Sequence, residues 1–192
     1  MNELKKMLPE TDEKHEYFDD VIGGLTQIRS IIKGSLDFSK VNNPKLEKLD
    51  IKNIIEGFCD EFKKSKNCTF ELDLNLAMVS VDHSLMQRVF FNLFENSFQA
   101  KKENCEISIK TEIIKKRVII YVGDKGKGIS EKLIKNIFEP FNSSKEDGLG
   151  IGLAFVSEVI KNHNGSIRVD SELGKGTAFT ILLPVYDEEK GK

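Results

Sequence analysis

The stretch Val118-Ile-Ile-Tyr-Val-Gly-Asp-Lys-Gly-Lys-Gly-Ile129 joins an apolar, strand-like run to an acidic residue and two closely spaced glycines. A second glycine cluster, Gly148-Leu-Gly-Ile-Gly-Leu153, follows about twenty residues later and leads into a helix-like run. A carboxylate after a strand can accept a hydrogen bond from a purine amino group. Glycines before a helix let backbone N–H groups approach phosphates. The two clusters together indicate a purine nucleotide site.

Around these clusters the apolar residues alternate between helical and strand-like spacing. The spacing predicts helices over 51–64, 85–100 and 151–162. It predicts strands over 69–74, 78–81, 106–114, 117–122, 166–171 and 177–184. Asp82 is expected to cap the second helix, and Asn164-Gly165 to end the third. This order predicts an α+β fold, a two-layer sandwich in which a mixed sheet carries helices on one face.

The first 44 residues have a different pattern. A short helical piece over 2–8 breaks at Pro9, and a long amphipathic helix follows, with one apolar stripe from Phe18 to Phe38. Asn42-Asn43-Pro44 is expected to end that helix. The short piece is too small to cover the stripe, so we expect a second copy of the chain to pack there. We therefore predict a long N-terminal helix, or a partial helical hairpin, that forms a homodimer.

Composition excludes several classes of partner. The chain has 192 residues and a formal net charge of −2, which favours neither a nucleic acid nor a membrane surface. No apolar run is long enough to span a bilayer, and no signal peptide opens the chain, so a cytoplasmic location is expected. Cys59, Cys68 and Cys105 lack metal-ligand spacing and are expected to be reduced thiols.

Two asparagines on the second predicted helix suggest a metal. Asn92 and Asn96 are four residues apart and share one helix face. A neutral amide oxygen suits Mg²⁺, which keeps several waters and bridges phosphates. The alternative is a solvated polar face or a helix cap. Asparagine is unfavourable in the middle of a helix, and two on one face weaken that alternative.

No single motif is specific on its own. Asp124 followed by glycine is also typical of a plain turn, and the second glycine cluster lacks both a dinucleotide fingerprint and a Walker lysine-serine pair. The order of five segments is more specific. They are Asn92–Ala100, Asp124–Ile129, Ile137–Phe141, Gly148–Leu153 and Gly174–Phe179. In that order they resemble the N, G1, F and G2 boxes and the final Gly-x-Gly-Thr-x-Phe segment of the ATP-binding domain of sensor histidine kinases. That domain belongs to the superfamily shared with gyrase, a heat-shock chaperone and a mismatch-repair ATPase.

The resemblance implies ATP and Mg²⁺ as ligands, with Asn96 holding the metal. It implies nucleotide contacts from Asn92, Asn96, Asp124, Gly126, Gly128, Ile129, Phe138, Phe141, Gly148, Leu149, Gly150, Gly152, Leu153 and Thr177. It implies catalytic roles for Glu95 and Lys145, although Lys145 could equally be a solvated loop lysine. The short lid with Glu139-Pro-Phe141 resembles the nitrogen-regulation subclass. We expect the lid, residues 130–147, to be mobile without nucleotide. Leu149 and Gly123 depart from the usual family residues, and neither departure removes a ligand.

The family transfers the γ-phosphate of ATP to a histidine on a dimeric helical hairpin. Residues 25–45 resemble the end of the second hairpin helix, which puts the acceptor upstream of Met1. The alternative acceptor is His15, which Tyr17-Phe18 follows here instead of the family's proline-containing bend. His83 and His163 are interpreted as structural. This register divides the chain into a partial dimerisation hairpin (1–44), an ATP-binding catalytic domain (45–186) and a charged tail (187–192).

The resemblance therefore predicts the ATP-binding catalytic part of a two-component sensor histidine kinase. Its expected partners are a response regulator receiver domain and a second copy of the chain. Two alternatives stay open. One is a nucleotide-binding module that lacks its own acceptor and docks a response regulator. The other is a serine kinase of the anti-sigma type, although such a kinase needs no dimerising helix of this kind.

Overall fold

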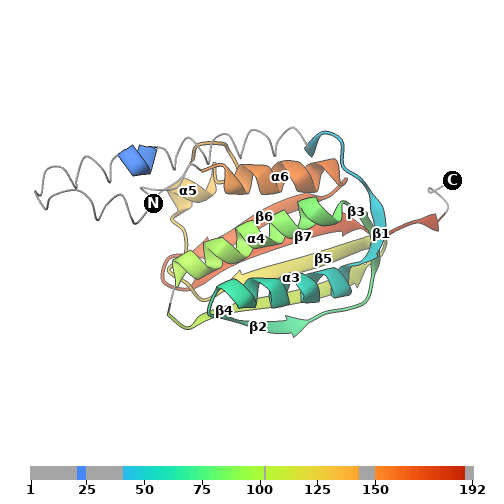
Figure 1. The fold of residues 1–192 in the computed structure, drawn as a ribbon, viewed down its shortest axis with the longest axis horizontal. Coiled ribbons are helices and arrows are strands. Elements are labelled where there is room, and N and C mark those ends of the chain that lie inside the picture. Colours follow the sequence, from blue (N-terminus) through green and yellow to red (C-terminus); the bar gives the residue numbers. More distant parts are fainter. Residues whose placement is uncertain (1–20, 25–40, 102, 143–149, 189–192) are drawn as a thin grey trace, which may run out of the picture.

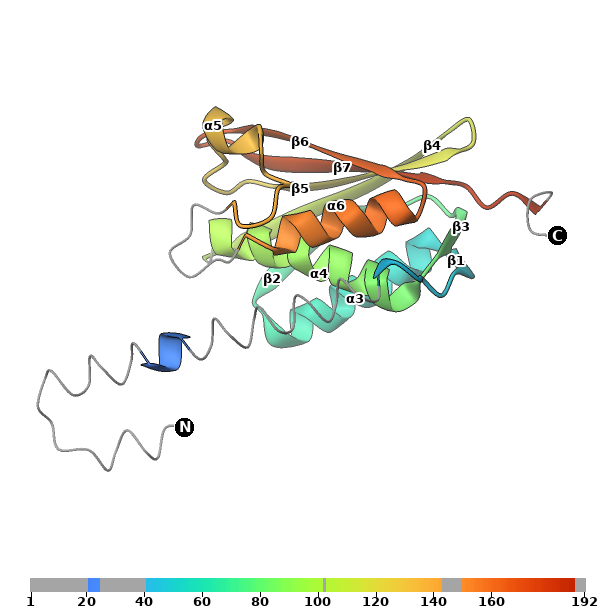
Figure 2. The ribbon, with the colours of Figure 1, turned by 90° about the horizontal axis from the view of Figure 1, so that it is seen from above.

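A five-stranded sheet and a layer of helices stack on each other in the computed structural model, which describes residues 21–24, 41–101, 103–142 and 150–188. The edge view in Figure 2 separates the two layers, with the helices on one face of the sheet. The predicted two-layer α+β fold is confirmed. Residues 21–24 are helical. The rest of the predicted N-terminal hairpin and its dimer contact lie outside the described residues.

The main sheet has the strand order β2-β4-β5-β7-β6. Its members are β2 (Cys68–Asp73), β4 (Cys105–Ile114), β5 (Arg117–Asp124), β6 (Ser166–Glu172) and β7 (Gly176–Pro184). Strands β2 and β4 run parallel, and all other neighbours are antiparallel. The sheet is therefore mixed, as predicted. Both hairpins, β4–β5 and β6–β7, form at the predicted turns (Figure 1).

A separate two-stranded sheet pairs β1 (Glu47–Asp50) with β3 (Met78–Val81) in antiparallel register. The sequence predicted β3 and not β1, because the run Glu-Lys-Leu-Asp lacks a strand-like apolar alternation. Val185, just after β7, forms a bridge to Val79 of β3. The small sheet therefore lies at the end of the main sheet where β7 finishes.

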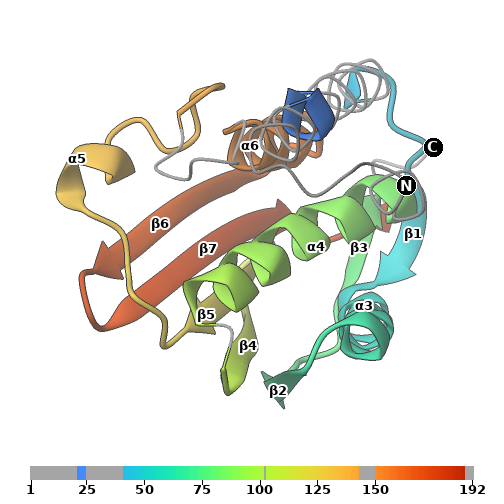
Figure 3. The same cartoon turned by 60° about the vertical axis from the view of Figure 1, so that its left-hand side comes forward.

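The helix layer consists of α3 (Ile51–Ser65), α4 (His83–Ala100) and α6 (Gly152–Asn162), with the short α5 (Glu131–Ile134) beside them. All three long helices were predicted to within two residues. Asp82 caps α4 as expected, because its carboxylate accepts a hydrogen bond from the N–H of Leu85. Figure 3, an oblique view, shows α4 crossing the sheet between α3 and α6. No described helix is both long and apolar enough to cross a membrane.

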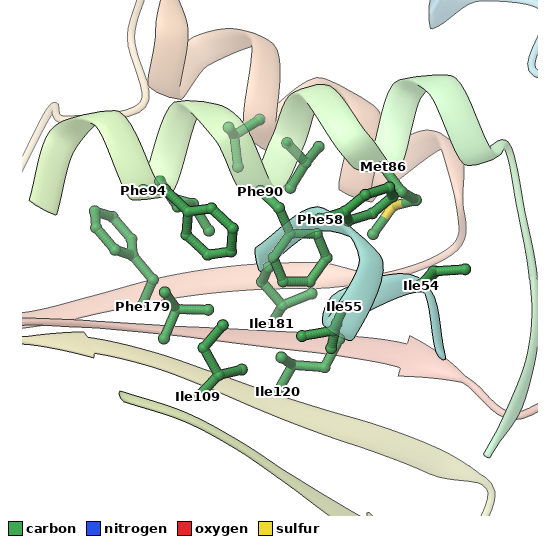
Figure 4. Close-up of a cluster of buried hydrophobic side chains, with 14 of the residues drawn as sticks. Ile54, Ile55, Phe58, Met86, Phe90, Phe94, Ile109, Ile120, Phe179 and Ile181 are labelled. Carbon is green, nitrogen blue, oxygen red and sulfur yellow. The ribbon is translucent and has the colours of Figure 1, made fainter. Parts of the chain in front are cut away.

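Aromatic side chains fill the space between the layers. Phe58 of α3 and Phe90 and Phe94 of α4 point toward Phe179 and the isoleucines of the sheet (Figure 4). The rings of Phe62 and Phe94 meet edge to face at 5.4 Å. This core fixes α4 against β4, β5 and β7. Its residues therefore hold the polar face of α4 in a constant position.

The cysteine prediction was wrong for two of the three residues. Cys68 and Cys105 are direct partners in the parallel β2–β4 register, with Cα atoms 4.8 Å apart, and they form a disulfide. The linear sequence hides this pairing, because 37 residues separate the two cysteines and only strand order brings them together. Cys59 is a free, buried thiol, and burial raises its pKa to about 12.

Candidate nucleotide site

The C-terminal end of α4, the end of β5 and the start of α6 meet at one end of the molecule (Figure 1). Three contacts join them. Ser97 of α4 donates to Asp124 of β5 over 3.1 Å, Gly126 lies against Ala100, and Asn92 lies against Gly152 at the start of α6. The structure therefore brings together the predicted Asn92–Ala100 and Asp124–Ile129 segments and the described end of the second glycine cluster.

Asp124 is the last residue of β5, and its carboxylate is held by its neighbours. The Gly126 N–H donates to Oδ1 over 2.8 Å, and the Ser97 hydroxyl donates to Oδ2 over 3.1 Å. Burial raises the pKa of Asp124 above its usual value, and hydrogen bonds from Gly126, Ser97 and Thr177 offset part of that rise. The result is an oriented, half-buried acceptor, which is the group needed to bind a base amino group.

Gly126 is required by close approach. A Cβ at this position would lie 2.5 Å from the Cβ of Ala100 and 2.8 Å from the Asp124 carboxylate. Any side chain would therefore push the loop away from α4 or displace the carboxylate. The glycine keeps the loop tight against the end of α4.

Ser171 connects two of the predicted segments, and the sequence did not reveal it. Its hydroxyl accepts from the N–H of Ile129 over 2.9 Å and donates to the carbonyl of Gly176 over 2.7 Å. It also lies 3.0 Å from the hydroxyl of Thr177. Thr177, buried, is the register partner of Asp124. Ser171 is the partner of Thr177 in the β6–β7 pairing. Pairing the two predicted strands as a hairpin from Thr177 would therefore have identified it.

Asn92 occupies the contact between α4 and α6. Its amide nitrogen donates to the carbonyl of Arg88 over 2.8 Å. Its Oδ1 lies 2.7 Å from the place that a Cβ on Gly152 would occupy, so a larger residue at this position would displace the Asn92 amide. No side chain caps the start of α6, and its first N–H groups face the same end of the molecule as Asp124. A helix N-terminus of this kind favours phosphate. Leu153 is partly buried and packs on the core.

Asn96 lies one turn beyond Asn92 on α4. The described residues contain no group of three or more histidine, cysteine or acidic side chains that could hold a metal. A metal here would therefore have few protein ligands. Mg²⁺ fits such a site, because it keeps most of its waters and is commonly held by one side-chain oxygen together with substrate phosphates. The residues present are thus compatible with Mg²⁺ carried on a nucleotide.

The segment after α5 packs partly on the protein. Ile137 is buried, and Phe138 packs against the core, whereas Phe141 is 75% exposed with a φ of 64°. The Asn142 backbone lies against Gly150, so the two ends of the intervening segment meet. Gly128 and Gly150 also have positive φ. The predicted contacts of Gly148 and Leu149, and the catalytic role of Lys145, fall on residues outside those described.

Glu95 faces another direction. Its carboxylate lies 3.6 Å from the Lys66 ammonium group, just after α3, and accepts from the Gln99 side chain over 3.0 Å. Figure 3 places α3 on the opposite side of α4 from α6. The structure therefore does not bring the Glu95 side chain to the contact between Asn92 and Gly152. Its catalytic role stays a prediction.

Comparison with known proteins agrees with this geometry. Residues 81–187 match the model of the histidine kinase-, DNA gyrase B- and HSP90-like ATPases. The chain belongs to this family. The match covers α4, all strands from β4 onward and α6, so it includes every described residue of the candidate site.

Curated relatives of this ATPase-family chain include a sporulation kinase and a sensor histidine kinase. Sporulation kinase A of Bacillus subtilis is 32% identical over an alignment of 189 positions, and the match covers 94% of this chain and 31% of that protein. The sensor histidine kinase ZraS of Salmonella typhimurium is 31% identical over 188 residues, covering 95% of this chain and 40% of that one. The chain thus spans less than half the length of these relatives.

Solved structures share the fold. The mycobacterial sensor histidine kinase MprB is 26% identical with a TM-score of 0.67, and the match covers 73% of this chain and 97% of that one. The catalytic domain of the histidine kinase ThkA is 26% identical with a TM-score of 0.65, covering 73% and 96%. Each of these two matches thus covers nearly all of the other chain and about three quarters of this one.

Proposed function

We propose that this chain is the ATP-binding catalytic part of a two-component sensor histidine kinase. The observation that carries the proposal is the oriented Asp124 carboxylate. It is held by Ser97 of α4 and by Gly126, and the same helix carries Asn92, which meets Gly152 at the start of α6. A base acceptor and a phosphate-binding helix end thus lie along one helix, α4. Family membership and the sensor-kinase relatives support the same activity.

In the proposed reaction a histidine ring nitrogen attacks the γ-phosphorus of ATP. The bond from that phosphorus to the bridging β–γ oxygen breaks, ADP leaves, and the ring proton passes to a nearby carboxylate. Asp124 accepts from the adenine amino group, and the N–H groups at the start of α6 bind phosphate oxygens. Mg²⁺, when bound through Asn96, would offset phosphate charge. The roles given above to the glycines, Ile129, Phe138, Phe141, Leu153 and Thr177 belong to the same proposal.

The acceptor histidine is proposed to lie on a helical hairpin, outside this chain or at His15. The two described histidines do not fit that role. His163 is buried and its ring nitrogens contact the N–H of Asp82 and the carbonyl of Val159. His83 begins α4, at the end opposite to Ala100, and its ring packs on Phe58. Transfer therefore requires a histidine from elsewhere.

The proposed partners follow from the same assignment. They are a second copy of the chain, through the N-terminal helix, and the receiver domain of a response regulator. A solved complex of the kinase ThkA with the response regulator TrrA has a kinase chain of similar fold, 24% identical with a TM-score of 0.71. A cytoplasmic location belongs to the same proposal. The alternative is a nucleotide-binding module that docks a response regulator and transfers nothing itself.

Transfer in trans separates these two functions. The chain would be mixed with γ-labelled ATP, Mg²⁺ and a helical hairpin that carries an intact acceptor histidine. We expect acid-labile, base-stable label on the hairpin, and much less label at sub-saturating ATP when Asp124→Asn replaces the wild-type chain. Binding of ATP without any transfer would leave the interaction module as the function. Absence of ATP binding would contradict both. Label on His15 would place the acceptor within this chain.

A further inference from the structure

Helices α4 and α6 run side by side in opposite directions, and three contacts along them define their register. At one end the Asp82 N–H, before α4, donates to His163 Nε2 over 3.0 Å. At the other end Asn92 meets Gly152. Between these contacts the Arg88 guanidinium lies over the Phe155 ring, 4.2 Å from its centroid. Arg88 is thus the next side chain along this interface after Asn92.

Arg88 shares a helix face with the candidate phosphate contacts. Arg88, Asn92 and Asn96 are spaced four residues apart on α4, so they lie along one side of the helix. Adjacent members are about 6 Å apart along the axis, given a rise of about 1.5 Å per residue. The base acceptor Asp124 contacts Ser97, near the opposite end of α4. A nucleotide that runs from Asp124 past Asn96 and Asn92 therefore points its last phosphate toward Arg88.

The surroundings of Arg88 suit an anion. The guanidinium is half-buried, and burial lowers the pKa of Arg88, although an arginine remains charged at any physiological pH. The guanidinium lies over the Phe155 ring, and its five N–H donors can serve more than one partner. A partly desolvated cation also interacts more strongly with a phosphate than an exposed one does. The backbone of Arg88 is held as well, because its carbonyl accepts from Asn92.

We propose that Arg88 binds the terminal phosphate of a bound nucleoside triphosphate and stabilises its charge during transfer. Phe155 acts as a positioning residue that holds the guanidinium in place. The inference rests on the proposed ATP-binding function. It adds a site residue that none of the five sequence motifs contributes, since Arg88 precedes the first motif by one helical turn. A purely structural role for the Arg88–Phe155 contact is the competing explanation.

Comparison of a diphosphate with a triphosphate separates these explanations. Binding of ADP and of a non-hydrolysable ATP analogue, each with Mg²⁺, would be measured by calorimetry for the wild-type chain, Arg88→Gln and Arg88→Lys. We expect Arg88→Gln to weaken the ATP analogue about tenfold or more, as for loss of a hydrogen bond to a charged group. ADP affinity should change by less than about twofold, because ADP lacks the contacted phosphate. Arg88→Lys should be intermediate, since lysine keeps the charge and loses the planar set of N–H donors.

Arg168→Gln is the matched control, because Arg168 is an exposed arginine on β6 whose described ion partner is Asp170. It should leave both affinities unchanged. Equal weakening of both nucleotides by Arg88→Gln and Arg88→Lys would show a structural role and overturn the proposal, as would no change in either. If Arg88→Gln does not fold, Arg88→Lys provides the test. Weaker binding of the ATP analogue with unchanged ADP binding supports the proposal, and an equal change or no change in both overturns it. A wild-type chain that binds neither nucleotide would instead refute the proposed function.

Discussion

The carboxylate of Asp124, the last residue of β5, is both partly buried and held in a fixed orientation. It is partly desolvated at the end of β5, and it is nevertheless oriented by donors on both oxygens, from Ser97 and Gly126. Desolvation strengthens any hydrogen bond that it accepts from a ligand. Orientation means that little entropy is lost when a base binds. We therefore expect this one carboxylate to decide base recognition.

Replacement of Asp124 by asparagine should weaken ATP and ADP binding to a similar extent. The amide removes the charge from the acceptor and places an N–H₂ group opposite a base amino group, so we expect a loss of about tenfold to a hundredfold. Calorimetry with both nucleotides measures the effect. Asp170→Asn, an exposed carboxylate on β6, is the control. An unchanged affinity in Asp124→Asn would remove Asp124 from the site.

The raised pKa of Asp124 predicts a pH dependence of binding. In the proposed site the base is bound by the ionised carboxylate, and protonation removes the negative charge and turns one oxygen into a donor as pH falls through the pKa. Because burial raises that pKa, nucleotide affinity should begin to fall at a higher pH than an ordinary aspartate would cause. Affinities measured over an acidic pH series test this. In Asp124→Asn the fall in affinity that comes from this carboxylate should be absent. A pH profile identical to that of the wild-type chain would contradict the role of Asp124.

The proposed metal ligand Asn96 makes a different prediction. Asn96→Ala should remove most of the Mg²⁺ dependence of nucleotide binding and leave the preference for adenine over guanine unchanged. The reason is that the metal bridges the protein to the phosphates, while Asp124 contacts the base. Affinities with and without Mg²⁺ measure the first effect. Gln99→Ala, on the exposed surface of α4, provides the control. A full Mg²⁺ response in Asn96→Ala would place the metal elsewhere.

Helix α4 carries the site along one face and the core along another, so its placement sets the site geometry. Its N-terminus is secured by Asp82, whose carboxylate accepts from Leu85 N–H, Lys45 N–H and the Ser84 hydroxyl. Burial alone would raise the pKa of Asp82, but these hydrogen bonds outweigh it and lower the pKa. The cap thus also anchors residue 45, where the chain enters the sheet-and-helix part.

Asp82→Ala should lower the free energy of unfolding by about 0.5–2 kcal/mol, the range measured for lost N-caps. Thermal or denaturant unfolding measures the loss. Ser130→Ala is the matched control, because Ser130 is the N-cap of α5 and its side chain makes no capping bond. The lowered pKa gives the sign of a pH effect. The stabilisation from Asp82 is present above the ordinary aspartate pKa and disappears as pH falls through the lowered one. Equal stability of the Asp82 and Ser130 variants would contradict this role.

Across the whole molecule, strand order brings together residues that are distant in the sequence. The parallel pairing of β2 with β4 joins Cys68 to Cys105, while β7 places Thr177 opposite Asp124. The disulfide therefore connects the edge strand to the strand that precedes β5. In a reducing compartment the same pair would be a dithiol, so its state depends on where the protein resides.

Reduction of this disulfide should destabilise the fold by about 2–4 kcal/mol, given that it closes a loop of 37 residues. Unfolding with and without a thiol reductant measures the difference. A double Cys68→Ala, Cys105→Ala variant should show no response to the reductant. Cys59→Ala, at the free buried thiol, should retain the full response. A wild-type chain whose stability ignores the reductant would mean that the bond contributes nothing.

Much of this protein could be predicted because its signals are local. The helical spacing of Ile54, Ile55, Phe58 and Phe62 predicted α3, and the Asp82 cap predicted the start of α4. Strand β1 escaped prediction, because four largely polar residues form a strand only through pairing with β3. Ser171 and the Cys68–Cys105 pair escaped for the same reason. Their partners are assigned by strand register, which local periodicity does not encode.

The linear sequence determined the kind of chemistry: an acidic residue after a strand, glycines before a helix, and asparagines on one helix face. These are properties of neighbouring residues, and a chain carries them whatever its partners. The tertiary structure alone decided which groups meet. In the folded chain Asp124 contacts Ser97, Gly152 contacts Asn92, and Phe155 contacts Arg88. Glu95 contacts Lys66 instead of the site. The physical reason is packing: α4 lies on the sheet between α3 and α6, and this placement fixes which neighbours the residues on each face of α4 can reach.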